Sequence, residues 1–204
     1  GVNGSYIDGP AHNIDLSYAF GGGVLAPNGK IIFVPRQSPV VGIYDPNDGV
    51  NGSYIDGATH TAPMHSGAVE AFRGGVLAPN GNIIFVPFGS KKIGIYNPFI
   101  YEYSNGTYEI QYSQAFMGGV LAPNGKVILV PCDSPYVGIY DSSSDTYSNG
   151  VRHYLEQVDV ASGIGAANGG ILAPNGKIIF IPRHNNRLPI YGDDYSLKNK
   201  NDVL

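Results

Sequence analysis

The side chains best able to do chemistry in this sequence are a few histidines and arginines in segments rich in turn-forming residues. His60 and His65 lie five residues apart, a spacing that matches no metal-binding motif, so solvated loop histidines are the simpler interpretation. Arg183, His184 and Arg187 would suit an anionic ligand such as an acidic sugar, or they form an ordinary exposed basic turn. The predicted ligand-binding residues are Arg36, His60, His65, Arg73, Arg183, His184 and Arg187.

The remaining residues do not indicate a catalytic centre. The lone cysteine, Cys132, is followed by Asp133, but no histidine is placed beside it to act as a general base. Residues 141–145 resemble a calcium loop but lack its glycine and its terminal glutamate, which favours a polar turn. We therefore predict no catalytic residue, no metal and no cofactor.

Three asparagines, Asn3, Asn51 and Asn105, stand in sequons for N-glycosylation. All three are expected at the same position of an outer strand, where a glycan would project outward. Asn-Gly is also a favoured turn pair, and one duplicated segment supplies two of the three sequons. We predict that the sequons are used, and with them an extracellular or cell-surface location.

These residues are positioned by a repeat that recurs about every fifty residues. Each copy contains Gly-Gly-(Val or Ile)-Leu-Ala-Pro-Asn-Gly, and the anchoring prolines are Pro27, Pro79, Pro123 and Pro174. Pro-Asn-Gly closes a short hairpin loop, because proline presets the first turn position and glycine supplies a positive φ. Glycine and proline inside every copy exclude a helical repeat. A hairpin in each repeat of this length predicts the blades of a β-propeller.

Four strands are expected in each copy. The first copy has strands at 22–26, 30–34 and 41–44, and outer strands are expected in segments such as 107–110. The second strands are continuously apolar, which is typical of sheets covered on both faces, and paired glycines open the first strands at a crowded axis. The predicted fold is an all-β propeller of four four-stranded antiparallel blades, or a fragment of a larger propeller. One domain covers 1–204, with repeats at approximately 21–57, 73–111, 117–154 and 168–198.

The closure of the ring has two interpretations. Residues 1–9 are identical to residues 49–57, which makes them an extra outer strand. In a closed four-bladed ring this strand would complete the last blade. Residues 194–196, however, resemble the outer strand of the preceding copy. The first strand would then be surplus, as in a fragment of a longer propeller or a strand donated to the sheet edge of another subunit.

Composition narrows the class of partner. The chain has 29 glycines, 15 prolines and 14% charged residues, as expected for a turn-dense all-β protein. A net charge of −4 provides no basic stripe, which argues against nucleic acid. No apolar run approaches the roughly 20 residues that span a bilayer, so we predict no membrane insertion.

The unit GGVLAPNGKIIFVP, followed by VGIYDP, resembles a set of uncharacterised bacterial, phage and protist repeat proteins with GGVLAPNGK-type propeller blades. It is similar, more loosely, to NHL and Kelch blades. The resemblance covers nearly the whole chain and implies the fold, but it implies no activity. Lactonase-type and streptogramin-lyase-type propellers need carboxylates or histidines around the axis, whereas the inner strands here contain no Asp, Glu or His.

We therefore predict a non-enzymatic structural or interaction module that binds other protein subunits and assembles into multimers or filaments through its sheet edges. One alternative is a lectin in which repeated tyrosines stack on sugars, namely Tyr44, Tyr96, Tyr140 and Tyr191. Another is a lyase or hydrolase that acts from the loop face.

Overall fold

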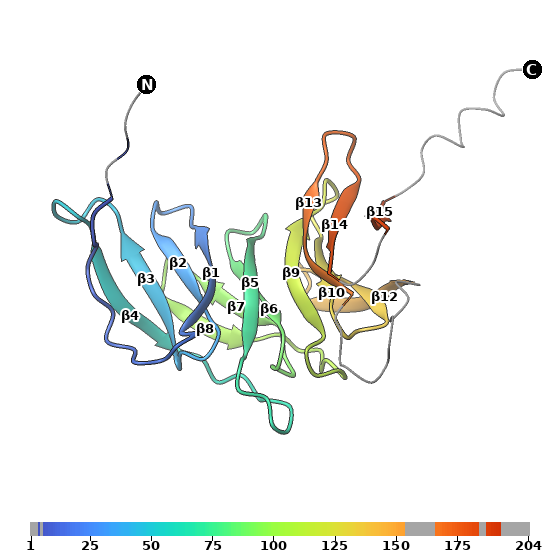
Figure 1. The fold of residues 1–204 in the computed structure, drawn as a ribbon, viewed down its shortest axis with the longest axis horizontal. Coiled ribbons are helices and arrows are strands. Elements are labelled where there is room, and N and C mark those ends of the chain that lie inside the picture. The colour runs from blue at the N-terminus through green and yellow to red at the C-terminus, as the bar shows by residue number, and fades with distance from the viewer. Residues whose placement is uncertain (1–3, 5, 154–165, 184–186, 193–204) are drawn as a thin grey trace, which may run out of the picture.

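The computed structural model describes Gly4 and residues 6–153, 166–183 and 187–192, and its regular structure in these ranges consists of strands alone (Figure 1). The strands form four antiparallel sheets, each from consecutive strands. Blade 1 has β1 (Phe20–Leu25), β2 (Ile31–Pro35), β3 (Val40–Asp45) and β4 (Ser53–Thr59). Blade 2 has β5 (Phe72–Leu77), β6 (Ile83–Pro87), β7 (Gly94–Asn97) and β8 (Glu102–Asn105). Blade 3 has β9 (Phe116–Leu121), β10 (Val127–Pro131), β11 (Tyr136–Asp141) and β12 (Thr146–Arg152). The described part of blade 4 has β13 (Ala167–Leu172), β14 (Ile178–Pro182) and β15 (Ile190–Tyr191).

The blades stand side by side in an arc, as Figure 1 shows. The inner strand of each blade packs on the next, so that β1 contacts β5, β5 contacts β9, and β9 contacts β13. Within the described residues, no contact of comparable extent joins β13 back to β1. The prediction of four propeller blades is confirmed, and the ring is open between blade 4 and blade 1.

Paired glycines let the inner strands approach at the axis. A β-bulge falls at this pair in every blade, and its first glycine has a positive φ. A Cβ on Gly74 would lie 3.3 Å from Cα of Gly118, and one on Gly118 would lie 3.3 Å from Cα of Gly169. The predicted close approach at the axis is therefore correct.

Two kinds of blade face meet at each internal interface. We call one the branched face; in blade 1 it consists of Val24, Ile32, Val34 and Ile43. The other is the glycine face; in blade 2 it consists of Gly75, Ile83, Phe85 and Tyr96. A Cβ on Gly75 would lie 2.9 Å from Cγ2 of Val34, so the absence of a side chain there makes room for the valine. The same arrangement buries the cores between blades 2 and 3 and between blades 3 and 4.

A second glycine receives an aromatic ring within the blade. A Cβ on Gly42 would lie 2.8 Å from Phe20, and Gly94 and Gly138 accommodate Phe72 and Phe116 in the same way. In blade 4 both positions differ, since alanine and proline stand there as Ala167 and Pro189. Both members of the phenylalanine–glycine pair are therefore replaced in blade 4.

The Pro-Asn-Gly turns also tie neighbouring blades together. The side-chain oxygen of Asn28 accepts a hydrogen bond from the backbone N–H of Lys30. The Nδ2 of Asn28 donates a hydrogen bond to the carbonyl of Pro98 in blade 2 at 2.7 Å. Asn80 repeats this bond to Ser142 in blade 3 at 2.8 Å. The asparagine therefore closes its own hairpin and holds the next blade.

The predicted outer strand at 107–110 is wrong, because β8 lies at 102–105, where Tyr103 pairs with Tyr96. Thr107 instead leaves the sheet and binds Asp145 of blade 3 through both its backbone N–H and its hydroxyl, at 3.0 Å each. Residues 6–9 belong to no strand in this structure. The outer strand predicted around 194–196 lies outside the described residues.

Candidate functional site

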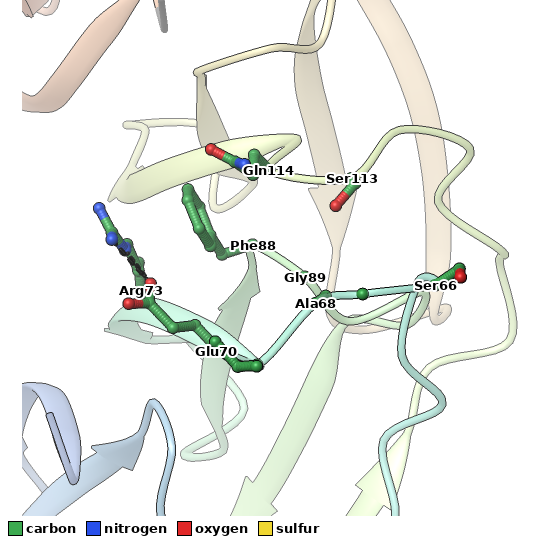
Figure 2. A pocket seen from close by; sticks show the side chains of 10 residues that line it. Ser66, Ala68, Glu70, Arg73, Phe88, Gly89, Ser113 and Gln114 are labelled. Carbon is green, nitrogen blue, oxygen red and sulfur yellow. Dashed lines mark hydrogen bonds and ion pairs between the residues drawn. The ribbon is translucent and has the colours of Figure 1, made fainter. Parts of the chain in front are cut away.

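A cavity of about 360 Å³ opens where the connectors between blades meet the loop after β6 (Figure 2). Its polar and aromatic lining comes from Ser66, Glu70, Arg73, Phe88, Ser113 and Gln114. The connectors 66–70 and 113–114 lead into β5 and β9, so the cavity lies beside the inner strands of two blades. It lies on the loop face, the face considered above for a lyase or hydrolase.

Glu70 anchors this site through two arginines. Arg36 Nη2 lies 2.6 Å from Glu70 Oε1, and Arg73 donates through Nε to Oε2 at 2.8 Å. The Glu70 side chain is only 13% exposed. Burial alone would raise the pKa of its carboxyl, but the hydrogen bonds from Arg36 and Arg73 outweigh burial and lower the pKa. Glu70 is therefore a fixed anion, poorly suited to general-base catalysis.

Aromatic side chains hold both arginines from the other side. The Arg73 guanidinium carbon lies 4.1 Å from the centre of the Phe88 ring, and that of Arg36 lies 4.3 Å from the centre of the Tyr18 ring. Arg73 also reaches the sulfur of Met117 in blade 3 at 3.8 Å. The structure thus brings together the predicted residues Arg36 and Arg73. Glu70 and Phe88 complete the site; the Glu-x-x-Arg spacing is the sequence signal for Glu70.

Arg183 occupies a separate position on the same face. Its Nη1 lies 3.8 Å from the sulfur of Cys132, whose side chain is buried beside Asp133. Burial and the nearby Asp133 raise the pKa of the Cys132 thiol to about 11, so it is not an activated nucleophile. Arg187 is exposed on blade 4 and does not line the cavity, and His184 lies outside the described residues.

The connector histidines are structural. His60 donates from Nε2 to the carbonyl of Ser38 at 3.0 Å, and its equivalent His153 binds the carbonyl of Ser134 at 2.7 Å. Burial lowers the pKa of both imidazoles. His65 donates its backbone N–H to the carbonyl of Gly89. Across the described ranges, no three His, Cys, Asp or Glu side chains lie close enough to hold a metal ion.

The tyrosines considered for sugar stacking mostly pack inside the blades. Tyr96 and Tyr140 are fully buried, and Tyr96 stacks on Phe85. Tyr44 is half-buried and donates its hydroxyl to the carbonyl of Asn51. Tyr96 and Tyr140 are therefore not available to stack on a sugar.

The sequons do not share one position, contrary to the sequence-based expectation. The register aligns Tyr54 with Tyr103, which puts Asn51 in the turn before β4 and Asn105 at the end of β8. Asn51 is exposed, whereas Asn105 is half-buried and its Nδ2 donates to the carbonyl of Thr61 at 3.2 Å. Asn3 lies outside the described residues.

Solved structures share this fold at low sequence identity. Virginiamycin B lyase from Staphylococcus aureus is 13% identical with a TM-score of 0.58, and the match covers 84% of this chain and 55% of the lyase. The WD40 β-propeller domain of Doa1 is 15% identical with a TM-score of 0.61, covering 91% and 53%. An auxiliary nutrient-binding protein from Bacteroides ovatus is 15% identical with a TM-score of 0.53, covering 85% and 42%.

The chain thus spans about half the length of the lyase and of the Doa1 domain, and less of the nutrient-binding protein. No protein-family profile and no curated protein sequence matches it. Within the described residues, no helix is long and apolar enough to cross a membrane. The similarities show a β-propeller fold.

Proposed function

We propose that this chain is an extracellular, N-glycosylated, non-enzymatic β-propeller that serves as a structural or interaction module and assembles with other protein subunits through its ends. The observation that supports this most is an apolar surface on blade 4. Ile181 is 45% exposed, although its equivalents Val34, Val86 and Val130 are each 0% exposed at the internal interfaces. An uncovered surface of this composition marks an interaction site.

The surface extends across the three described strands of blade 4. Ile171 on β13 is 63% exposed and Ile190 on β15 is 59% exposed, and both lie on the branched face with Ile181. Removing apolar surface from water stabilises an assembly by about 25 cal/mol per Å². Covering these isoleucines with a matching blade face therefore contributes to association and offsets part of its entropic cost.

Sedimentation analysis of the protein produced in a secreting eukaryotic host tests the proposal. We expect a particle heavier than one glycosylated chain, which Ile181→Glu reduces to a single chain. A monomeric particle at micromolar concentration would contradict the assembly, and wild-type mass retained by Ile181→Glu would exclude this surface.

Glycosylation is proposed at Asn51 in particular, because its side chain is exposed in a turn. At Asn105 the amide nitrogen that would carry the glycan is engaged with Thr61, and Gly106 beside it is buried. We expect glycopeptide mass spectrometry to find high occupancy at Asn51 and low occupancy at Asn105. Equal occupancy would mean that modification precedes folding of blade 2.

The cavity favours a second candidate function, the binding of a small polar ligand such as an acidic carbohydrate. Arg73 presents a cation against Phe88, and Gln114 and Ser66 offer hydrogen-bonding groups around it. Titration calorimetry with a panel of uronic acids would test it, with Gln114→Ala as the cavity variant and Gln37→Ala, which lies outside the cavity, as the control. Binding that Gln114→Ala leaves unchanged would place the ligand elsewhere.

A further inference from the structure

We infer that two copies of this chain associate head to tail and close one eight-bladed ring. In each copy the branched face of blade 4 packs on the glycine face of blade 1 in the other. This inference rests on the proposed function, for which it names the partner and the geometry.

The two faces that no other described blade covers are the two halves of an interface that the chain already forms three times. The branched face of blade 4 consists of Ile171, Ile179, Ile181 and Ile190, which the strand registers align with Val24, Ile32, Val34 and Ile43 of blade 1. The glycine face of blade 1 consists of Gly23, Ile31, Phe33 and Tyr44, which align with Gly75, Ile83, Phe85 and Tyr96 of blade 2. A second copy therefore presents the kind of face on which branched side chains, valine or isoleucine, already pack inside the chain.

The segment before blade 1 is arranged as though another blade preceded it. His60, at the end of blade 1, packs on blade 2 with ring centres 5.6 Å from Phe72 and 6.0 Å from Tyr103. His12 is its repeat equivalent and packs on blade 1 in the same way, 5.8 Å from Phe20 and 5.9 Å from Tyr54. The segment around His12 therefore already packs on blade 1 as a connector from a preceding blade would.

The segment that would form the outer strand before this connector is exposed. Tyr6 is 89% exposed and Ile7 is 61% exposed, and Tyr6 donates to Asp8 as Tyr54 donates to Asp56 in β4. The equivalent pairing of Tyr44 with Tyr54 would place Tyr6 beside Tyr191 of blade 4 in the other copy. A strand added at a free edge extends a sheet by main-chain hydrogen bonds.

The described edge of blade 4 accepts such a strand. Within the described residues, β15 is the last strand of its sheet. Phe180 donates its backbone N–H to the carbonyl of Pro189. In an antiparallel pair the nitrogen and the carbonyl of one residue face the same neighbouring strand, so the Pro189 nitrogen, which carries no hydrogen, faces β14. The outer side of β15 therefore keeps its backbone donors and acceptors.

The separation of blade 1 from blade 4 favours a second copy over closure within one chain. Four blades in a closed ring turn by about 90° each, and eight turn by about 45° each. Blades 1 and 4 would be neighbours in a four-bladed ring, but in this structure they share no extended contact among the described residues. The arc also superposes on about half of a longer propeller, with 91% of this chain matching 53% of the Doa1 domain. A ring of that size has room for a second arc like this one.

A pair of engineered cysteines tests the contact directly. At the internal interface, a Cβ on Gly75 would lie 2.9 Å from Cγ2 of Val34, and the equivalent residues at the proposed interface are Gly23 and Ile181. Gly23→Cys with Ile181→Cys should therefore give a covalent dimer on a non-reducing gel after mild oxidation. Gly75→Cys with Val34→Cys is the matched control, and it should form its disulfide within one chain. The native Cys132 is buried and stays in all variants.

The outcomes separate the inference from the proposed function. A dimer with twice the 21.6 kDa chain mass by light scattering, trapped by the first pair, supports the two-chain ring. A ladder of larger species overturns the ring but leaves assembly through the ends standing. A disulfide within a monomer overturns both, because the chain then closes on itself. Failure of the first pair to form a disulfide, while the control pair forms one, also overturns the ring.

A second variant tests the same contact without cysteines, in case the cysteine substitutions prevent folding. Ile181→Glu should keep the strand signal in circular dichroism and sediment as a monomer. Val50→Glu is the matched control, since Val50 is 100% exposed in the turn between β3 and β4, away from either face. It should remain a dimer. A dimer of Ile181→Glu would overturn the inference.

Discussion

Replacement of Glu70 by glutamine should destabilise the fold measurably, because one carboxylate holds two guanidinium groups. A hydrogen bond to a charged group contributes about 1.5–3 kcal/mol, against roughly 0.5–1.5 for a neutral one. Glutamine fills the same space, but it carries no charge, and its NH2 group replaces one of the two oxygens that accept hydrogen bonds from Arg36 and Arg73. The side chains of Arg36 and Arg73 are 20% and 26% exposed, so water can partly solvate their charges when the carboxylate is removed. We expect a loss of about 2 kcal/mol in the free energy of unfolding at pH 7.

Urea unfolding followed by circular dichroism measures this loss, and urea leaves charge interactions unscreened. Glu109→Gln is the control, because Glu109 is 56% exposed and lies 3.9 Å from Lys91, a pair worth less than about 0.5 kcal/mol. Equally small losses of unfolding free energy in Glu70→Gln and Glu109→Gln would contradict this reasoning.

The pH dependence gives a second readout from the same variants. The pKa of Glu70 is lowered in the folded state, so its contribution is complete above the ordinary value of 4.5 and is lost as the pH falls through the folded pKa. The stability difference between wild type and Glu70→Gln should therefore be constant from pH 7 to 5 and then shrink. A difference that persists below the folded pKa would refute the role of the charge.

Two further predictions follow from buried positions. With its pKa raised to about 11, Cys132 should react with a thiol reagent at pH 8 at least about 100-fold more slowly in the folded protein than in urea, and comparable rates would contradict its burial. Gly118→Ala should cost about 3 kcal/mol and Gly125→Ala about 1, because both have a positive φ but only a Cβ at Gly118 meets backbone, at Cα of Gly169. Equal midpoints in thermal unfolding would exclude the axial clash.

The inner strands were predictable from sequence because their signals are local. Pro-Asn-Gly specifies its own turn, and the apolar runs of β2, β6, β10 and β14 identify buried strands without reference to the rest of the chain. The bonds from Asn28 to Pro98 and from Asn80 to Ser142 span 70 and 62 residues, and no local pattern encodes them.

The outer strands and the site depended on longer-range partners. The segment at 107–110 has strand-like residues, but Thr107 has better partners on Asp145 of the next blade than on its own sheet. Arg36 and Arg73 were identified as cations, yet only the fold shows that Glu70 joins them. Repeat alignment alone would have identified His153, since it occupies in blade 3 the position of His60.

The phenylalanine that fits over a glycine inside each of the first three blades has a consequence for how such a chain can grow. Phe20 lies on the first strand and Gly42 on the third, so a crossover within a blade keeps the pair matched among the first three blades, but a crossover with blade 4 would join unmatched partners. Blade 4 would accept neither half of that pair, because alanine and proline replace both members there. The faces between blades, by contrast, are nearly interchangeable. Duplication or recombination that copies whole blades therefore preserves packing, and the complete blade is the unit in which this architecture can be inherited.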